Sequence, residues 1–163
     1  MPTTQAQQTA IRTDTATLAV FDPARLQHRL DDAPDWWSVP WDEVEEINRG
    51  NVLFVSTGVD GDYVVHVYQE SLPGNVGVVA VQAILACDSG SLYIGAGEYV
   101  PSGGLQPETK HGGLFLRVPK GNYRVSVVHL IAYCLDVFVE PADGSPVNAF
   151  EDSPRVPWPR DAT

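Results

Sequence analysis

The residues best suited to chemistry in this chain lie between positions 31 and 46, where seven carboxylates and three tryptophans occur without a lysine or arginine. Such dense negative charge repels itself, so a folded chain keeps it either for solubility or to meet a positive partner. Complementary charge speeds encounter with a basic protein, and tryptophan is enriched at protein interfaces. We predict a surface that binds a basic protein and includes Asp35, Trp36, Trp37, Asp42, Glu43 and Glu46. The alternative is that the tryptophans are core residues and the carboxylates a solvated face.

A second set of polar residues lies in or next to the loop over residues 101–113. This loop is longer than most connections between strands. Loops of this length often bind ligands, although a flexible bridge between strands is the simpler interpretation. If the loop binds a sugar or metabolite, the polar side chains within reach are Glu98, Glu108, Lys110 and His111. A β-sandwich that binds a small ligand is therefore the alternative functional hypothesis.

The spacing of histidine, cysteine and serine shows no motif for catalysis or metal binding. The four histidines form no HxH or HExxH pattern, and no CxxC pair occurs. Cys87 and Cys134 both lie in apolar runs, which predicts two reduced and buried thiols. Ser89 lacks the Gly-x-Ser-x-Gly frame of a serine nucleophile. We predict no catalytic residue, no metal and no cofactor.

The overall charge narrows the possible partners. A net charge of −11 argues against nucleic acid, whose phosphates require a basic surface, and disfavours anionic membranes. The first residues lack a basic start followed by an apolar segment, so no secretory signal is predicted. No apolar run reaches the roughly 18 residues of a membrane span. We therefore expect a cytoplasmic protein.

Alternation of apolar and polar residues after position 51 predicts an all-β fold. Short helices are expected only near the N-terminus, over 24–30 and over 41–47. Hairpins are predicted at the turn sequences Asp60-Gly61, Asp88-Ser89-Gly90 and Lys120-Gly121. Nearly continuous apolar runs at 76–87 and 125–135 indicate strands covered on both faces. The predicted fold is an antiparallel β-sandwich, jelly-roll-like or barrel-like.

A chain of 163 residues, 44% of them hydrophobic and 19% charged, is expected to form one domain. Residues 1–14 are rich in threonine and glutamine, which predicts a flexible tail unless a strand pairs with them. The sandwich domain is expected over 15–145. The proline-rich residues 146–163 are predicted to lie extended along the surface, with Trp158 as a possible anchor.

Three segments of the sequence also resemble a known family. They are Thr13-Asp14-Thr15-Ala16-Thr17-Leu18, the run from Arg29 to Trp37 with its Asp-Trp-Trp motif, and Glu46-Ile47-Asn48-Arg49-Gly50-Asn51-Val52. Over residues 13–70 the chain resembles small acidic bacterial domains of unknown function, with weaker similarity at 90–95 and 118–125. The resemblance implies no catalytic residue. Such domains look like the immunity partners of bacterial toxins, which implies an inhibitor of a basic toxin or nuclease.

Overall fold

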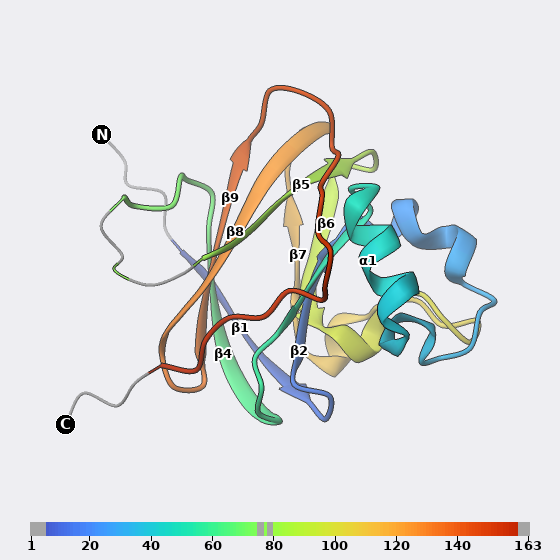
Figure 1. The fold of residues 1–163 in the computed structure, drawn as a ribbon, viewed down its shortest axis with the longest axis horizontal. Coiled ribbons are helices and arrows are strands. Elements are labelled where there is room, and N and C mark those ends of the chain that lie inside the picture. The colour runs from blue at the N-terminus through green and yellow to red at the C-terminus, as the bar shows by residue number, and fades with distance from the viewer. Residues whose placement is uncertain (1–5, 75–76, 78–79, 160–163) are drawn as a thin grey trace.

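The computed structural model describes residues 6–74, 77 and 80–159, and it shows two stacked β-sheets (Figure 1). The five-stranded sheet has the order β1 (Gln7–Thr13), β4 (Gly61–Tyr68), β9 (Cys134–Pro141), β8 (Gly121–Ile131) and β5 (Val81–Cys87). The four-stranded sheet has the order β3 (Val52–Ser56), β2 (Thr17–Phe21), β6 (Ser91–Ala96) and β7 (Leu114–Arg117). Neither sheet closes on itself, so the predicted β-sandwich is confirmed in its open form.

The three predicted hairpins are wrong, because each of the three turns carries the chain from one sheet to the other. The connections β3–β4, β5–β6 and β7–β8 all join strands of different sheets. Gly90, between β5 and β6, has a φ of 85°, a left-handed backbone conformation that favours glycine. The turn sequence therefore predicts a reversal, but it does not predict which strand becomes the hydrogen-bonded neighbour.

Strand β8 does form a hairpin with β9, through a turn in which Tyr133 adopts a φ of 60°. Strand β9 then lies beside β4 in parallel, with His66 opposite Asp136. The expected strand from Val76 begins at Val81, and residue 76 lies outside the described residues.

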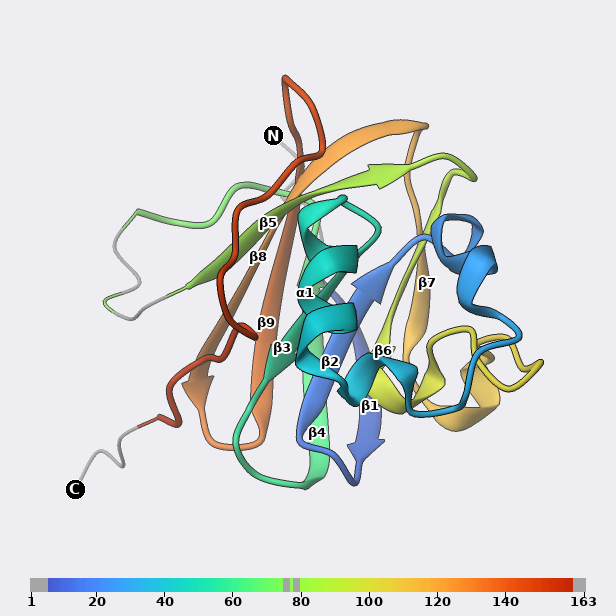
Figure 2. The same ribbon diagram turned by 45° about the vertical axis from the view of Figure 1, so that its right-hand side comes forward.

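Short helices cover the outer face of the four-stranded sheet and make a third layer (Figure 2). They are η1 (Pro23–Arg29), η2 (Trp36–Ser38) and α1 (Pro40–Asn48), while η3 (Gly97–Tyr99) and η4 (Thr109–His111) follow later in the chain. Asp22 caps the first of them, accepting a hydrogen bond from the Ala24 amide at 3.0 Å. No helix in the described ranges is long and apolar enough to cross a membrane.

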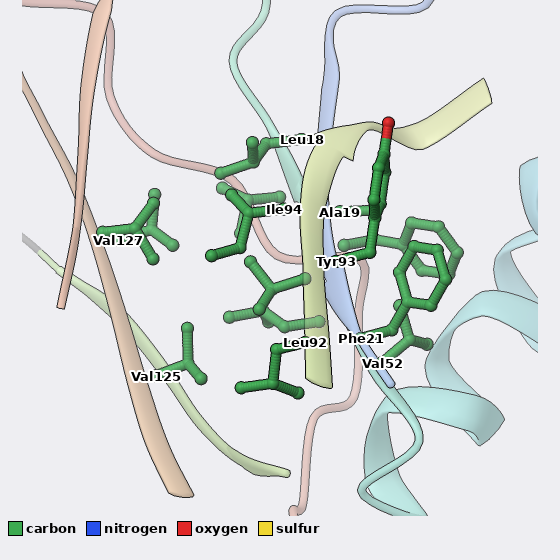
Figure 3. Packing of buried hydrophobic residues seen from close by; sticks show 14 of the residues in the cluster. Leu18, Ala19, Phe21, Val52, Leu92, Tyr93, Ile94, Val125 and Val127 are labelled. Atoms are coloured by element: carbon green, nitrogen blue, oxygen red, sulfur yellow. The ribbon is translucent and has the colours of Figure 1, made fainter. Parts of the chain in front are cut away.

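The core occupies both faces of the four-stranded sheet. Figure 3 shows Leu18 and Ile94 directed toward Val127 of the five-stranded sheet, while Phe21 and Tyr93 point to the side of the helices. All five residues of β2 are buried. A strand covered on both faces reads as a continuous apolar run, which explains the absence of alternation there.

Both chain ends contribute more to the fold than the sequence suggests. The predicted N-terminal tail is corrected, because residues 7–13 form β1 and pair with β4; residues 1–5 lie outside the described part. The C-terminal segment is extended, as predicted, yet it pairs with β3, because the Ser56 amide donates to the Pro154 carbonyl and the Ser56 carbonyl accepts from the Val156 amide, both at 3.0 Å. Val156 is buried, and Trp158 packs against Tyr63 and His129. This segment is therefore part of the structural core.

Candidate functional site

Two of the tryptophans predicted to face a partner are buried instead. Trp36 and Trp37 are each 5% exposed and pack on Phe54 of the four-stranded sheet, with Trp37 stacked at 5.6 Å. The indole of Trp36 also donates a hydrogen bond to the Pro101 carbonyl at 3.0 Å. Burying these rings removes a large apolar surface from water, which stabilises the fold, so both tryptophans are core residues. The expectation that they are exposed is wrong.

Glu46 is also fully buried, which corrects its predicted place on the surface. Its carboxylate accepts hydrogen bonds from Arg29 Nε at 2.8 Å and from Asn51 Nδ2 at 2.8 Å, and it lies 2.6 Å from His28 Nε2. A charge removed from water needs partners of this kind, because its desolvation is otherwise prohibitive. Glu46 therefore fastens α1 to η1 and to the start of β3.

Arg29 is the cation that makes this burial possible. Its guanidinium lies 4.6 Å over the ring of Trp36 and forms further ion pairs with Asp32 and Asp42 at 3.1 and 3.3 Å. Burial alone would raise the pKa of Glu46, but the hydrogen bonds from Arg29, Asn51 and His28 lower it. Part of the negative charge of this segment is therefore neutralised by Arg29 within the protein and is not available to a partner.

The other predicted residues of the acidic segment remain accessible to different degrees. Asp35 is exposed, while Asp42 and Glu43 are half-buried on α1. Asp42 is engaged by Arg29. Among the described residues Glu43 has no basic partner, and burial raises its pKa although a hydrogen bond with Ser153 lowers it. Asp35 and Glu43 are therefore the predicted residues best placed to meet a partner.

The third tryptophan of the segment, Trp41, is 80% exposed on α1. It borders a groove of about 640 Å³ between this helix and the C-terminal segment. The sequence predictions omitted Trp41 from the site. Helical spacing could have found it, because Trp41, Val44, Glu45 and Asn48 fall on one face while Ile47 points into the core.

Two asparagines hold the walls of this groove together. The side chain of Asn48 on α1 donates to the Phe150 carbonyl at 3.0 Å and accepts from the Phe150 amide at 2.8 Å. Asn148 bonds the amide and carbonyl of Ile84 at 2.8 and 2.9 Å and donates to the Ile47 carbonyl at 2.8 Å. The groove is fixed before any partner arrives, which lowers the ordering cost of binding.

The groove combines an apolar floor with an acidic rim. Its apolar lining comes from Pro40, Trp41, Val44, Val147 and Phe150, and its carboxylates are Glu45, Glu151 and Asp152. Arg49 is the basic residue of the lining, and it is paired with Glu45 at 2.7 Å. Glu151 and Asp152 are exposed. We call these lining residues the Trp41 groove.

The sequence profile of a protein family, described as a family of unknown function, DUF6386, matches residues 5–140. The chain belongs to the DUF6386 family. The matched residues include nearly all of both sheets, and they include α1 with Trp41. A search of the curated proteins finds no match.

Two solved structures share the fold of the DUF6386 domain. One is described as ComJ, inhibitor of the DNA degrading activity of NucA, from Bacillus subtilis. Its TM-score is 0.52 at 12% identity, with 86% of this chain and 98% of that chain covered. The other is described as crocagin biosynthetic gene J, with a TM-score of 0.57 at 15% identity and coverage of 84% and 97%. At these identities the likeness extends to the fold alone.

The residues predicted for a small ligand are largely engaged with one another or with the β1–β2 turn. Glu98 accepts hydrogen bonds from Thr13 Oγ1 at 2.6 Å and from the Asp14 amide at 2.8 Å. Glu108 pairs with Lys110 at 2.8 Å, an ion pair that lowers the pKa of Glu108. His111 stacks on Tyr99 with ring centroids 4.7 Å apart. These contacts engage the carboxylates of Glu98 and Glu108 and one face of the His111 ring.

Proposed function

We propose that this DUF6386 domain is a protein-binding inhibitor that docks a basic protein through the Trp41 groove. The observation that carries the proposal is the exposure of Trp41, which is 80% accessible although its two neighbours in the segment are buried. Leaving a large aromatic ring in water forgoes the free energy of its burial, and tryptophan is a frequent hot spot at protein interfaces. A partner that covers this ring recovers that free energy.

The charge around the groove favours a basic partner. Glu43 lies on α1, and Glu151 and Asp152 lie on the C-terminal segment. Within the part of the chain that the structure describes, these three carboxylates form no ion pair with a basic side chain. The chain as a whole has a net charge of −11. Attraction of this kind mainly raises the association rate and selects among partners, while the buried aromatic contact contributes affinity.

The fold supports a nuclease or another toxin as the class of partner. ComJ, which has a similar fold, is described as the inhibitor of a DNA-degrading activity. Many nucleases bind an acidic substrate and therefore present a basic surface, which an acidic inhibitor can cover. The proposal for this chain rests on the groove, and the fold likeness adds the candidate class.

The experiment is affinity capture from the native host at low salt, followed by purification of the captured protein and measurement of its association rate. A variant with Glu43→Lys, Glu151→Lys and Asp152→Lys should associate at least about tenfold more slowly at low salt. The difference should shrink at high salt, because screening removes it. A captured protein that is acidic, or one that associates with the variant at the unchanged rate, would contradict the proposal.

A sandwich that binds a sugar or metabolite near Glu98 and the loop over residues 101–113 is the alternative proposal. A thermal-shift screen separates the two functions, because a ligand that binds the folded state raises the melting temperature without any protein partner. Stabilisation that His111→Ala abolishes and Trp41→Ala preserves would favour the ligand-binding alternative.

A further inference from the structure

The outer face of the five-stranded sheet brings together a histidine, a cysteine and an aspartate that are far apart in the sequence. Strands β4 and β9 are parallel neighbours, with Val64 opposite Cys134 and His66 opposite Asp136. Residues two apart in a strand point to the same face, so His66, Cys134 and Asp136 share one face. All three are half-buried, which corrects the expectation that Cys134 is a buried core thiol.

The two distances from the His66 ring to the other side chains match those between ligands of one ion. His66 Nδ1 lies 3.5 Å from Cys134 Sγ and 3.4 Å from Asp136 Oδ1, and the three ligand atoms lie within 4.8 Å of one another. A tetrahedral zinc ion with Zn–S of about 2.3 Å and Zn–N and Zn–O of about 2.0–2.1 Å gives edges of about 3.5 Å between sulfur and nitrogen and about 3.4 Å between nitrogen and oxygen.

The same geometry argues against a nucleophilic triad. In a Cys-His-Asp triad one ring nitrogen faces the nucleophile, and the carboxylate orients the ring through the other nitrogen. Here the single nitrogen Nδ1 of His66 faces both Cys134 and Asp136. In the tautomer that leaves Nδ1 unprotonated, this nitrogen can bind a cation that Cys134 and Asp136 also reach.

We propose that His66 Nδ1, Cys134 Sγ and an Asp136 carboxylate oxygen bind one Zn²⁺, with a fourth position open to water. One sulfur, one nitrogen and one oxygen ligand suit a borderline-soft ion, whereas calcium and magnesium prefer oxygen ligands alone. Binding forms a zinc–thiolate bond and releases the thiol proton of Cys134 to the solvent. Three protein ligands with an open position is also the arrangement of many catalytic zinc sites.

The surrounding sheet makes this site rigid. Two of the ligands lie on β9 and the third on β4, so the ion would fasten a parallel strand pair side by side (Figure 1). The ring of Tyr68, two residues from His66, stacks on Phe138 at 4.8 Å, two residues from Asp136. This aromatic pair continues the same face and restricts solvent on that side of the site.

The test is titration of the tag-free, full-length protein with Co²⁺ and Zn²⁺. We expect one Co²⁺ per chain, with an intense thiolate-to-cobalt charge-transfer band and the strong visible bands of four-coordinate cobalt. Zinc should displace the cobalt and raise Tm by about 5 °C or more at a free concentration ~100-fold above Kd. Cys134→Ser and His66→Gln should each weaken binding at least tenfold, and Cys134→Ser should abolish the band.

Cys87→Ser is the matched control, because Cys87 is the other free cysteine of the described chain and is buried away from β4 and β9 on β5. It should keep the band and the affinity. A wild-type protein that binds no zinc, or that binds cobalt without the thiolate band, would overturn the proposal without any variant. Loss of the band in Cys87→Ser with retention in Cys134→Ser would also overturn it.

Discussion

Arg29 Nε donates a hydrogen bond to Glu46 Oε2 at 2.8 Å, and Glu46 is fully buried. This ion pair joins η1 to α1, the helix that presents Trp41 to solvent. The exposed tryptophan is therefore held in place by a carboxylate of the same acidic segment. Within the acidic segment, Glu46 therefore stabilises the fold, whereas Trp41 is exposed to solvent.

Replacing Glu46 with glutamine should lower the free energy of unfolding by about 3 kcal/mol at neutral pH, because it leaves the Arg29 charge with weaker compensation. The folded-state pKa of Glu46 is lowered, so its contribution is complete above the ordinary pKa of about 4.5 and is lost as the pH falls through the lower folded value. Urea denaturation at a series of pH values should show the gap between wild type and variant narrowing in acid. Glu70→Gln, at an exposed position, should leave no gap; a constant gap for Glu46→Gln would contradict this account.

His129 should make the protein less stable in mild acid. It is 3% exposed, and burial lowers its pKa by more than the nearby backbone of Ile131 raises it. The folded state therefore resists protonation, and stability is lost as the pH falls below the ordinary value of 6.5. His129→Phe should match or exceed wild type by about 1 kcal/mol at pH 8 and exceed it further at lower pH. A difference in melting temperature between His129→Phe and wild type that stays constant across this pH range would contradict the prediction.

Asn148→Ala should destabilise the fold by about 1–3 kcal/mol, because the amide and carbonyl of Ile84 and the carbonyl of Ile47 lose their partner. The same change should loosen the groove, since Asn148 connects the C-terminal segment to the edge of β5. Chemical denaturation measures the first effect. Val147→Ala, at a 67% exposed neighbour, is the control and should leave stability nearly unchanged. Equal stabilities of the two variants would refute the role of Asn148.

Much of the fold could be predicted from local patterns. Asp22-Pro23 predicts its helix because both residues act on the adjacent turn, and the apolar runs predict strands because burial sets their composition. The strand pairing could not be predicted in this way. Asp60-Gly61 specifies a reversal, but β4 pairs with β1 and β9, and packing between distant segments determines both pairings.

The candidate site shows the same division. The acidic segment could be found because its charge density is visible in the sequence. The exposure of each side chain could not be predicted, because it depends on contacts with distant residues. Glu46 is buried because Arg29, seventeen positions earlier, reaches it. Trp36 and Trp37 are covered because Phe54 lies beneath them. The proposed zinc ligands were missed because pairing of β4 with β9 joins residues separated by 68 positions.

The most direct test of partner docking is the affinity of Trp41→Ala for the captured partner, measured by calorimetry at fixed salt. The account predicts a loss of at least about 2 kcal/mol, or roughly 30-fold, with an unchanged melting temperature because Trp41 is 80% exposed. Ile131→Ala, at the 67% exposed last residue of β8, should bind as wild type does. Equal affinity of Trp41→Ala and wild type would contradict docking at the Trp41 groove.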